Sequence, residues 1–145
     1  AEGGYGLAQL APGDQTTVRR VVARIQAETG ENPLLIELPA RGPEIRRRAL
    51  IGHIIGRPLR QGEVTDERAR RLTVERPYTL IFIDNAEWLH PEALLWLCTN
   101  LRTVTDAFIL AVHDWEKFME VAGRNHDVAW VLGRSIPVNL VGLGE

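Results

Sequence analysis

A run of apolar and β-branched residues, Tyr78–Ile83, ends abruptly in an acid, Asp84. A short apolar run of this kind is typical of a strand that is buried on both faces of a parallel sheet. Such a strand places its last residue at the carboxyl edge of the sheet, where the ligands of open α/β sheets bind. The segment therefore predicts a parallel α/β sheet with Asp84 at its binding edge.

The rest of the chain alternates short apolar runs with segments of helical spacing. The predicted strands are residues 33–38, 78–84, 107–112 and 136–141, with residues 5–11 as either a further strand or a loose leader. The predicted helices are residues 14–29, 43–55, 65–75, 91–101, 114–121 and 127–132. This alternation implies right-handed βαβ crossovers. We therefore predict an α/β fold, a three-layer α/β/α sandwich with a mostly parallel sheet of four or five strands.

The composition excludes several classes of protein. A length of 145 residues is typical of one domain, so residues 1–145 are predicted to form a single domain. The net charge of −2 points to no polyanionic partner by itself. A single cysteine, Cys98, excludes an internal disulfide, and no histidine stands at metal-ligand spacing from it, so we predict neither zinc nor haem. Without a leader or a membrane-length apolar run, a cytoplasmic location without membrane contact is expected.

Three parts of the chain carry a family resemblance. They are residues 34–59, the string 80–89 with its Asp-Asn-Ala-Glu, and residues 108–112 together with 133–136. Their order and spacing resemble the core domain of an AAA-type P-loop NTPase, and within that group the transposition ATPases of the TniB and Mu B kind. The string around Asp84 is also similar to that of signal-transduction ATPases. The resemblance implies ATP and magnesium as ligands, and the helical lid of the family is not expected at the carboxyl end.

The resemblance also implies roles for individual side chains. Asp84 corresponds to the acid that holds magnesium, and Asn85 stands in the second Walker B position, where a glutamate is usual. Glu87 is the candidate replacement acid, Arg134 the candidate arginine finger, and His113 the candidate sensor of the γ-phosphate. Simpler alternatives stay open for each: a capping or solvated acid, a surface arginine, and a histidine bonded to a local carbonyl.

The loop that should bind phosphate departs from the family. A P-loop needs Gly-x4-Gly-Lys-Ser/Thr, and the corresponding residues here are Gly13, Asp14, Gln15, Thr16 and Thr17. Glutamine brings no charge to the position of the lysine, and the aspartate brings a negative one. At an effective dielectric constant of about 20, unit charges about 4 Å apart repel by roughly 4 kcal/mol. Weak or absent nucleotide binding is therefore expected.

A basic cluster opens the predicted second helix. Arg46, Arg47 and Arg48 are consecutive. Such a cluster can contact DNA phosphates, and the alternative is a solvated helix face.

These observations favour a regulatory or interaction module, a pseudo-ATPase with weak or absent hydrolysis that works through a protein partner or self-association. One alternative is an active, DNA-associated, oligomeric ATPase of the transposition type. Another is a protein–protein adaptor without any ligand.

Overall fold

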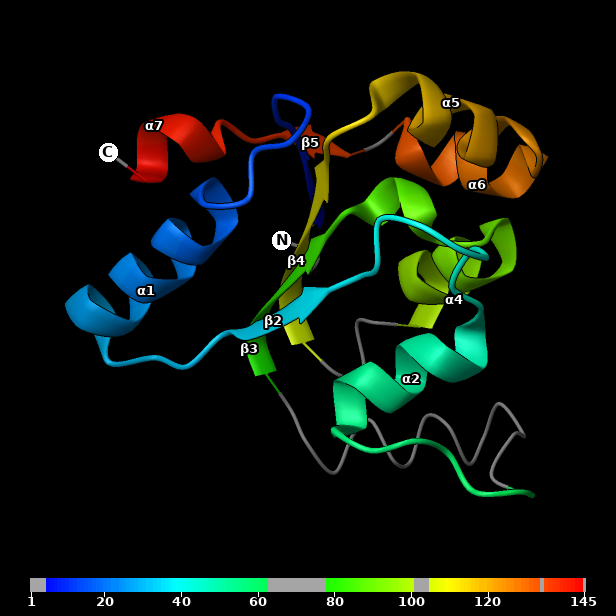
Figure 1. The fold of residues 1–145 in the computed structure, drawn as a ribbon, viewed down its shortest axis with the longest axis horizontal. Coiled ribbons are helices and arrows are strands. Elements are labelled where there is room, and N and C mark those ends of the chain that lie inside the picture. Colours follow the sequence, from blue (N-terminus) through cyan, green and yellow to red (C-terminus); the bar gives the residue numbers. More distant parts are fainter. Residues whose placement is uncertain (1–4, 63–77, 101–104, 134, 145) are drawn as a thin grey trace.

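The computed structural model describes residues 5–62, 78–100, 105–133 and 135–144, and these form a five-stranded sheet in the order β2-β3-β4-β1-β5 (Figure 1). The strands are β1 (Tyr5–Gln9), β2 (Leu34–Glu37), β3 (Tyr78–Asp84), β4 (Thr105–Val112) and β5 (Ile136–Pro137). Each pair of neighbouring strands is parallel. The prediction of a parallel α/β sheet is confirmed, and residues 5–9 are a strand in its interior, not a loose leader.

Helices cover both faces of the sheet, which makes the predicted three layers (Figure 1). On one face lie α1 (Thr17–Thr29) and α7 (Leu140–Gly144). On the other lie α2 (Arg47–Ile55), the short 3-10 helix η1 (Ala86–Trp88), α4 (Pro91–Asn100), α5 (Trp115–Gly123) and α6 (His126–Leu132). Among the described residues, no helix is both long enough and apolar enough to cross a bilayer.

The alternation of side chains along β3 explains the two cores. Ile81 and Ile83 point toward α2 and α4, Phe82 between them points toward α1, and all three are 0% exposed. A strand buried on both faces has no polar position until it ends. Leu80 to Ile83 are all apolar, so Asp84 is the residue at the carboxyl end of β3 that can serve a ligand or a polar network.

The two largest differences between predicted and observed boundaries lie in the second helix and the last strand. The second helix begins at Arg47 rather than at residue 43, because Ile45 pairs with η1 through bonds from its N–H to the Trp88 carbonyl (2.7 Å) and from the His90 N–H to its own carbonyl (2.8 Å). The last strand ends at Pro137 rather than at residue 141. There the Asn139 side chain accepts the N–H of Gly142 (3.1 Å) and opens α7.

Two further helix predictions have different outcomes. The end of the first helix is confirmed, since Gly30 adopts a left-handed conformation (φ 73°) that favours glycine. The predicted helix at residues 65–75 lies outside the described residues.

Candidate functional site

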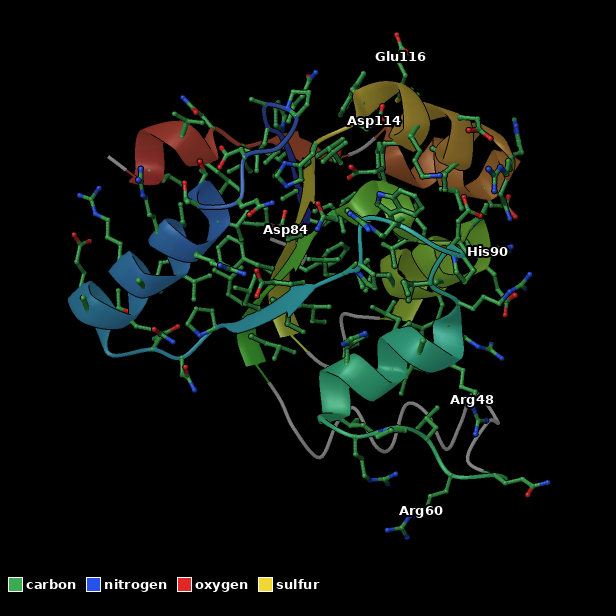
Figure 2. All side chains as sticks on the ribbon, in the orientation of Figure 1. Arg48, Arg60, Asp84, His90, Asp114 and Glu116 are labelled. Carbon is green, nitrogen blue, oxygen red and sulfur yellow. The ribbon has the colours of Figure 1, made fainter. Side chains whose placement is uncertain are left out.

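The carboxyl edge of the sheet holds a cavity of about 390 Å³. Its polar lining comes from the loop before α1, from α1 itself, and from the ends of β2, β3 and β4: Asp14, Gln15, Arg19, Glu37, Asp84, Asn85 and His113. Figure 2 shows Asp84 near the centre of the molecule, at the end of its strand. Since the strands are parallel, their carboxyl ends meet at this edge, and the cavity lies where the sequence predicts a binding site.

Asp14 lies in the loop directly before α1. Its Oδ1 accepts the backbone N–H groups of Thr16 and Thr17 (3.1 Å each), and its Oδ2 accepts the Thr17 hydroxyl (2.5 Å). The hydrogen bond from the Thr17 side chain, followed by the two backbone bonds, lowers the pKa of Asp14 below its usual 3.8. A fixed anion therefore lies on the N–H groups where a P-loop binds phosphate.

His113 joins three segments of the edge. Its Nε2 lies 2.6 Å from Asp84 Oδ1, and its Nδ1 lies 3.2 Å from the carbonyl oxygen of Ala11. A carbonyl oxygen only accepts, so Nδ1 carries a proton, and the second short contact requires another proton between Nε2 and the carboxylate. The predicted bond to a carbonyl is therefore present, together with an acid partner that the sequence did not indicate.

The pKa of His113 reflects these contacts. Burial lowers it, but the hydrogen bond to Asp84, the bond to the Ala11 carbonyl and the charges of Asp84 and Glu87 together outweigh burial. The pKa is raised above its usual 6.5. The raised pKa favours the imidazolium form of the ring beside Asp84, whose side chain is 9% exposed.

Glu87 has a different environment from the one predicted. It is 3% exposed, and its two carboxylate oxygens accept the N–H groups of His113 (3.2 Å) and Asp114 (3.0 Å). The alternative of a solvated carboxylate is wrong, because η1 turns the side chain inward beneath the start of α5. Glu87 does not line the cavity, and its contacts hold the end of β4 in place.

Asn85 shows why an amide stands after Asp84. Its backbone is left-handed (φ 58°), a conformation that asparagine tolerates better than most residues. Its side-chain N–H₂ donates to the Leu38 carbonyl (2.9 Å), and its backbone N–H donates to Asp84 Oδ1 (3.0 Å). Asn85 thus ties the ends of β2 and β3 together.

Arg19 and Glu37 also line the cavity, although no motif of the sequence pointed to them. Arg19 Nε lies 2.7 Å from Glu37 Oε2, and this ion pair lines the cavity between α1 and β2. Glu37 pairs in register with Asp84 across β2 and β3. An acid at the end of an apolar run was the signal available, and it is the same signal that identified Asp84.

The remaining predicted residues lie elsewhere. Arg134 is outside the described residues. Arg46, Arg47 and Arg48 lie at the start of α2 and do not line this cavity. Lys117, the one lysine of the sequence, lies 3.6 Å from Glu44 and 4.4 Å from the ring centre of Trp88.

The cavity has a slight excess of negative charge. Asp14, Glu37 and Asp84 contribute three carboxylates, against the guanidinium of Arg19 and the imidazolium of His113. Among the described residues, no group of three or more metal-ligating side chains is arranged around a metal site. The charged groups of the cavity are paired with groups of the protein itself: Arg19 with Glu37, His113 with Asp84, and Asp14 with the start of α1. The excess negative charge makes the cavity unfavourable for an anion.

Comparison with known proteins identifies the fold. No family model matches the sequence, and no curated protein matches it. Among solved structures, a DNA polymerase III gamma subunit-related protein from Thermotoga maritima is similar, with a TM-score of 0.52 and 11% sequence identity. The match covers 95% of this chain and 41% of that protein, so this chain spans less than half of its length. The likeness shows the fold alone, a parallel α/β fold like that of P-loop NTPases.

Proposed function

We propose that this chain is a regulatory or protein-interaction module on a P-loop NTPase-like fold, in which its own side chains take the places of a nucleotide phosphate and a magnesium ion. One observation carries this proposal: Asp14 is bonded to the first turn of α1 while His113 is bonded to Asp84. An internal anion and an internal cation together neutralise the groups that would otherwise bind the charged ligand.

The start of α1 is the place where a P-loop NTPase binds phosphate. Backbone N–H groups at a helix N-terminus bind phosphate when they are free to do so. Here those of Thr16 and Thr17 donate to Asp14, and Gln15 supplies no charge. A phosphate oxygen about 4 Å from Asp14 meets a repulsion of about 1 kcal/mol in bulk water and about 4 kcal/mol at a protein surface. The residues present do not fit a bound polyphosphate.

Asp84 stands where a P-loop NTPase holds its magnesium ion. Asp84 Oδ1 accepts hydrogen bonds from His113 and from the Asn85 N–H. A magnesium ion on that oxygen has to displace a cation held at 2.6 Å, and magnesium gives up its water reluctantly. The carboxylate therefore supports the architecture of the edge, and we assign it no step of ATP hydrolysis.

The fold also supports a role in a protein assembly. The structural neighbour is related to a subunit of a polymerase, and this chain covers 41% of it. We propose a protein partner or self-association for this chain on that likeness. Descent from transposition ATPases, a DNA-associated active form and a ligand-free adaptor remain the alternatives to be separated by experiment.

Calorimetry with ATP and ADP in the presence of magnesium tests the proposal. The unchanged chain is expected to bind neither nucleotide at millimolar concentration. The double variant Asp14→Gly with Gln15→Lys frees the N–H groups of the first turn and adds the missing cation, so it is expected to gain measurable binding. The loss of the cap costs about 1 kcal/mol of stability, so thermal unfolding is measured in parallel.

Matched controls separate the alternatives. Gln15→Lys alone keeps the Asp14 anion and is expected to bind less than the double variant. Micromolar binding by the unchanged chain that disappears in Asp84→Ala would overturn the proposal and favour the active ATPase. A double variant that binds no nucleotide would show that the loop chemistry is not what closes the site.

A further inference from the structure

A second hollow of about 710 Å³ runs along the outer face of α2. The side chains and backbone that line it include those of Arg46, Arg48, Ala49, Gly52, Pro58 and Leu59. Figure 2 shows Arg48 and Arg60 beside α2 and the chain that follows it, away from Asp84. The groove therefore belongs to a different part of the molecule from the cavity at the carboxyl edge.

The floor of the groove is small and apolar. α2 turns Leu50 and Ile54 into the core, at 0% and 1% exposure, which leaves Ala49 and Gly52 on its outer side. Leu59 is buried at 9% exposure and closes the wall that follows the helix. Because Ala49 itself is exposed, the hollow is open to solvent along one side. Small molecules normally bind in pockets that enclose most of their surface. An open groove of this kind therefore fits an extended or helical peptide segment better than a small molecule.

The rim of the groove is positively charged. Arg48 Nη2 donates to the carbonyls of Leu59 (3.0 Å) and Arg60 (3.1 Å), and these neutral acceptors fix the guanidinium without compensating its charge. The side chain of Arg46 is 67% exposed and approaches Glu92 only to 3.8 Å. In a chain with a net charge of −2, the three arginines that line this groove, Arg46, Arg48 and Arg57, concentrate a field opposite to that of the whole molecule.

We propose that the α2 groove binds a segment of a partner protein that carries acidic and apolar side chains. An apolar side chain fills the space over Ala49, beside the backbone of Arg57 and Pro58 that covers Gly52, and flanking carboxylates pair with the guanidinium groups of Arg46 and Arg48. Arginine is suited to this role because its planar group binds carboxylates through paired hydrogen bonds.

The lining favours a peptide over a nucleic acid. Its described residues include no tryptophan, tyrosine or phenylalanine on which a base stacks, and the one aromatic ring is the imidazole of His53. Phosphate contacts need charge but no apolar floor, whereas a peptide uses both. The inference is independent of the proposed function, since it holds whether or not nucleotide binds at the carboxyl edge.

Fluorescence anisotropy with a short fluorescein-labelled peptide of leucine and glutamate tests the proposal. The full chain is expected to bind this peptide and not the matching peptide in which glutamine replaces glutamate. Arg46→Glu reverses a charge on the rim, and Ala49→Glu fills the floor with an acid. Each is expected to weaken binding about tenfold, which corresponds to about 1.4 kcal/mol.

The controls make the result decisive. Arg20→Glu makes the same charge change at an exposed position of α1, on the opposite face of the sheet, and is expected to leave binding unchanged. Arg46 and Ala49 are exposed, so their variants are expected to fold, and circular dichroism checks this. Equal binding of the glutamine peptide, or equal loss in Arg20→Glu, would overturn the proposal. So would tighter binding of duplex DNA that depends on Arg46.

Discussion

Replacing His113 by glutamine removes the cation that bridges the Ala11 carbonyl and Asp84. The bridge has a charge-assisted contact of 2.6 Å and a contact of 3.2 Å to a neutral carbonyl. Hydrogen bonds to charged groups contribute about 1.5–3 kcal/mol and neutral ones about 0.5–1.5 kcal/mol. Glutamine retains part of the neutral bonding and none of the charge. We therefore expect His113→Gln to lower the free energy of unfolding by about 2 kcal/mol near pH 6.

The effect depends on pH in a defined direction. The pKa of His113 is raised above 6.5 in the folded chain. A group of this kind contributes stability that is fully present below the pKa of the unfolded chain and is lost as the pH rises through the folded value. The difference between the unchanged chain and the variant is therefore expected to be largest near pH 6 and to shrink toward about pH 9.

Urea unfolding at a series of pH values measures this difference. The other histidines, His53, His90 and His126, are present in both proteins, so their titrations cancel in the subtraction. A difference that stays constant between about pH 6 and about pH 9 would refute the assignment of an imidazolium to His113. Nitrogen chemical shifts of the ring then report its protonation independently.

Three further outcomes are expected from the described contacts. Asp14→Ala removes the cap of α1 and is expected to cost about 1 kcal/mol at neutral pH. Because the folded pKa of Asp14 lies below 3.8, this cost should vanish as the pH falls through that lower value, and a constant cost in acid urea titrations contradicts it. Asn85→Gly and Asn85→Ala both lose the bond to the Leu38 carbonyl, but only the alanine variant has to place a side chain at φ 58°. Thermal unfolding should therefore show the alanine variant to be less stable than the glycine variant by about 1 kcal/mol. Burial raises the pKa of Cys98 to about 12, so iodoacetamide is expected to label it only after unfolding, and rapid labelling of the native chain argues against this.

Much of the fold was readable from local patterns. The apolar run before Asp84 predicted both a buried strand and its place at the binding edge, because burial on two faces leaves no polar position inside the run. The same reasoning applied to Glu37 would have added it to the site. By contrast, Ile45 and Asn139 were assigned to the wrong elements, because their partners are backbone groups of η1 and α7 that local spacing does not reveal.

The contacts of the site depended on tertiary structure. Asp84 and His113 are 29 residues apart in the sequence, and Ala11 and His113 are 102 apart. The position of each at a strand end was predictable, but the bonding of one ring to both partners depends on strand order. The burial of Glu87 likewise depends on the placement of α5 over η1, so the sequence left open whether this acid is a catalytic replacement or a solvated carboxylate.

The position of β1 in the sheet has a consequence for synthesis. Tyr5 pairs with Phe108, and Gln9 pairs with Val112, so β1 is translated about a hundred residues before its partner strand β4. Long-range parallel pairing of this kind slows folding, because a large loop closes before any contact forms. β1 stays unpaired while about a hundred residues are translated, and during this time α1 lacks the complete sheet face on which it packs. The cavity is therefore among the last features to assemble, and a nascent chain that ends before β4 exposes an apolar strand available to a chaperone.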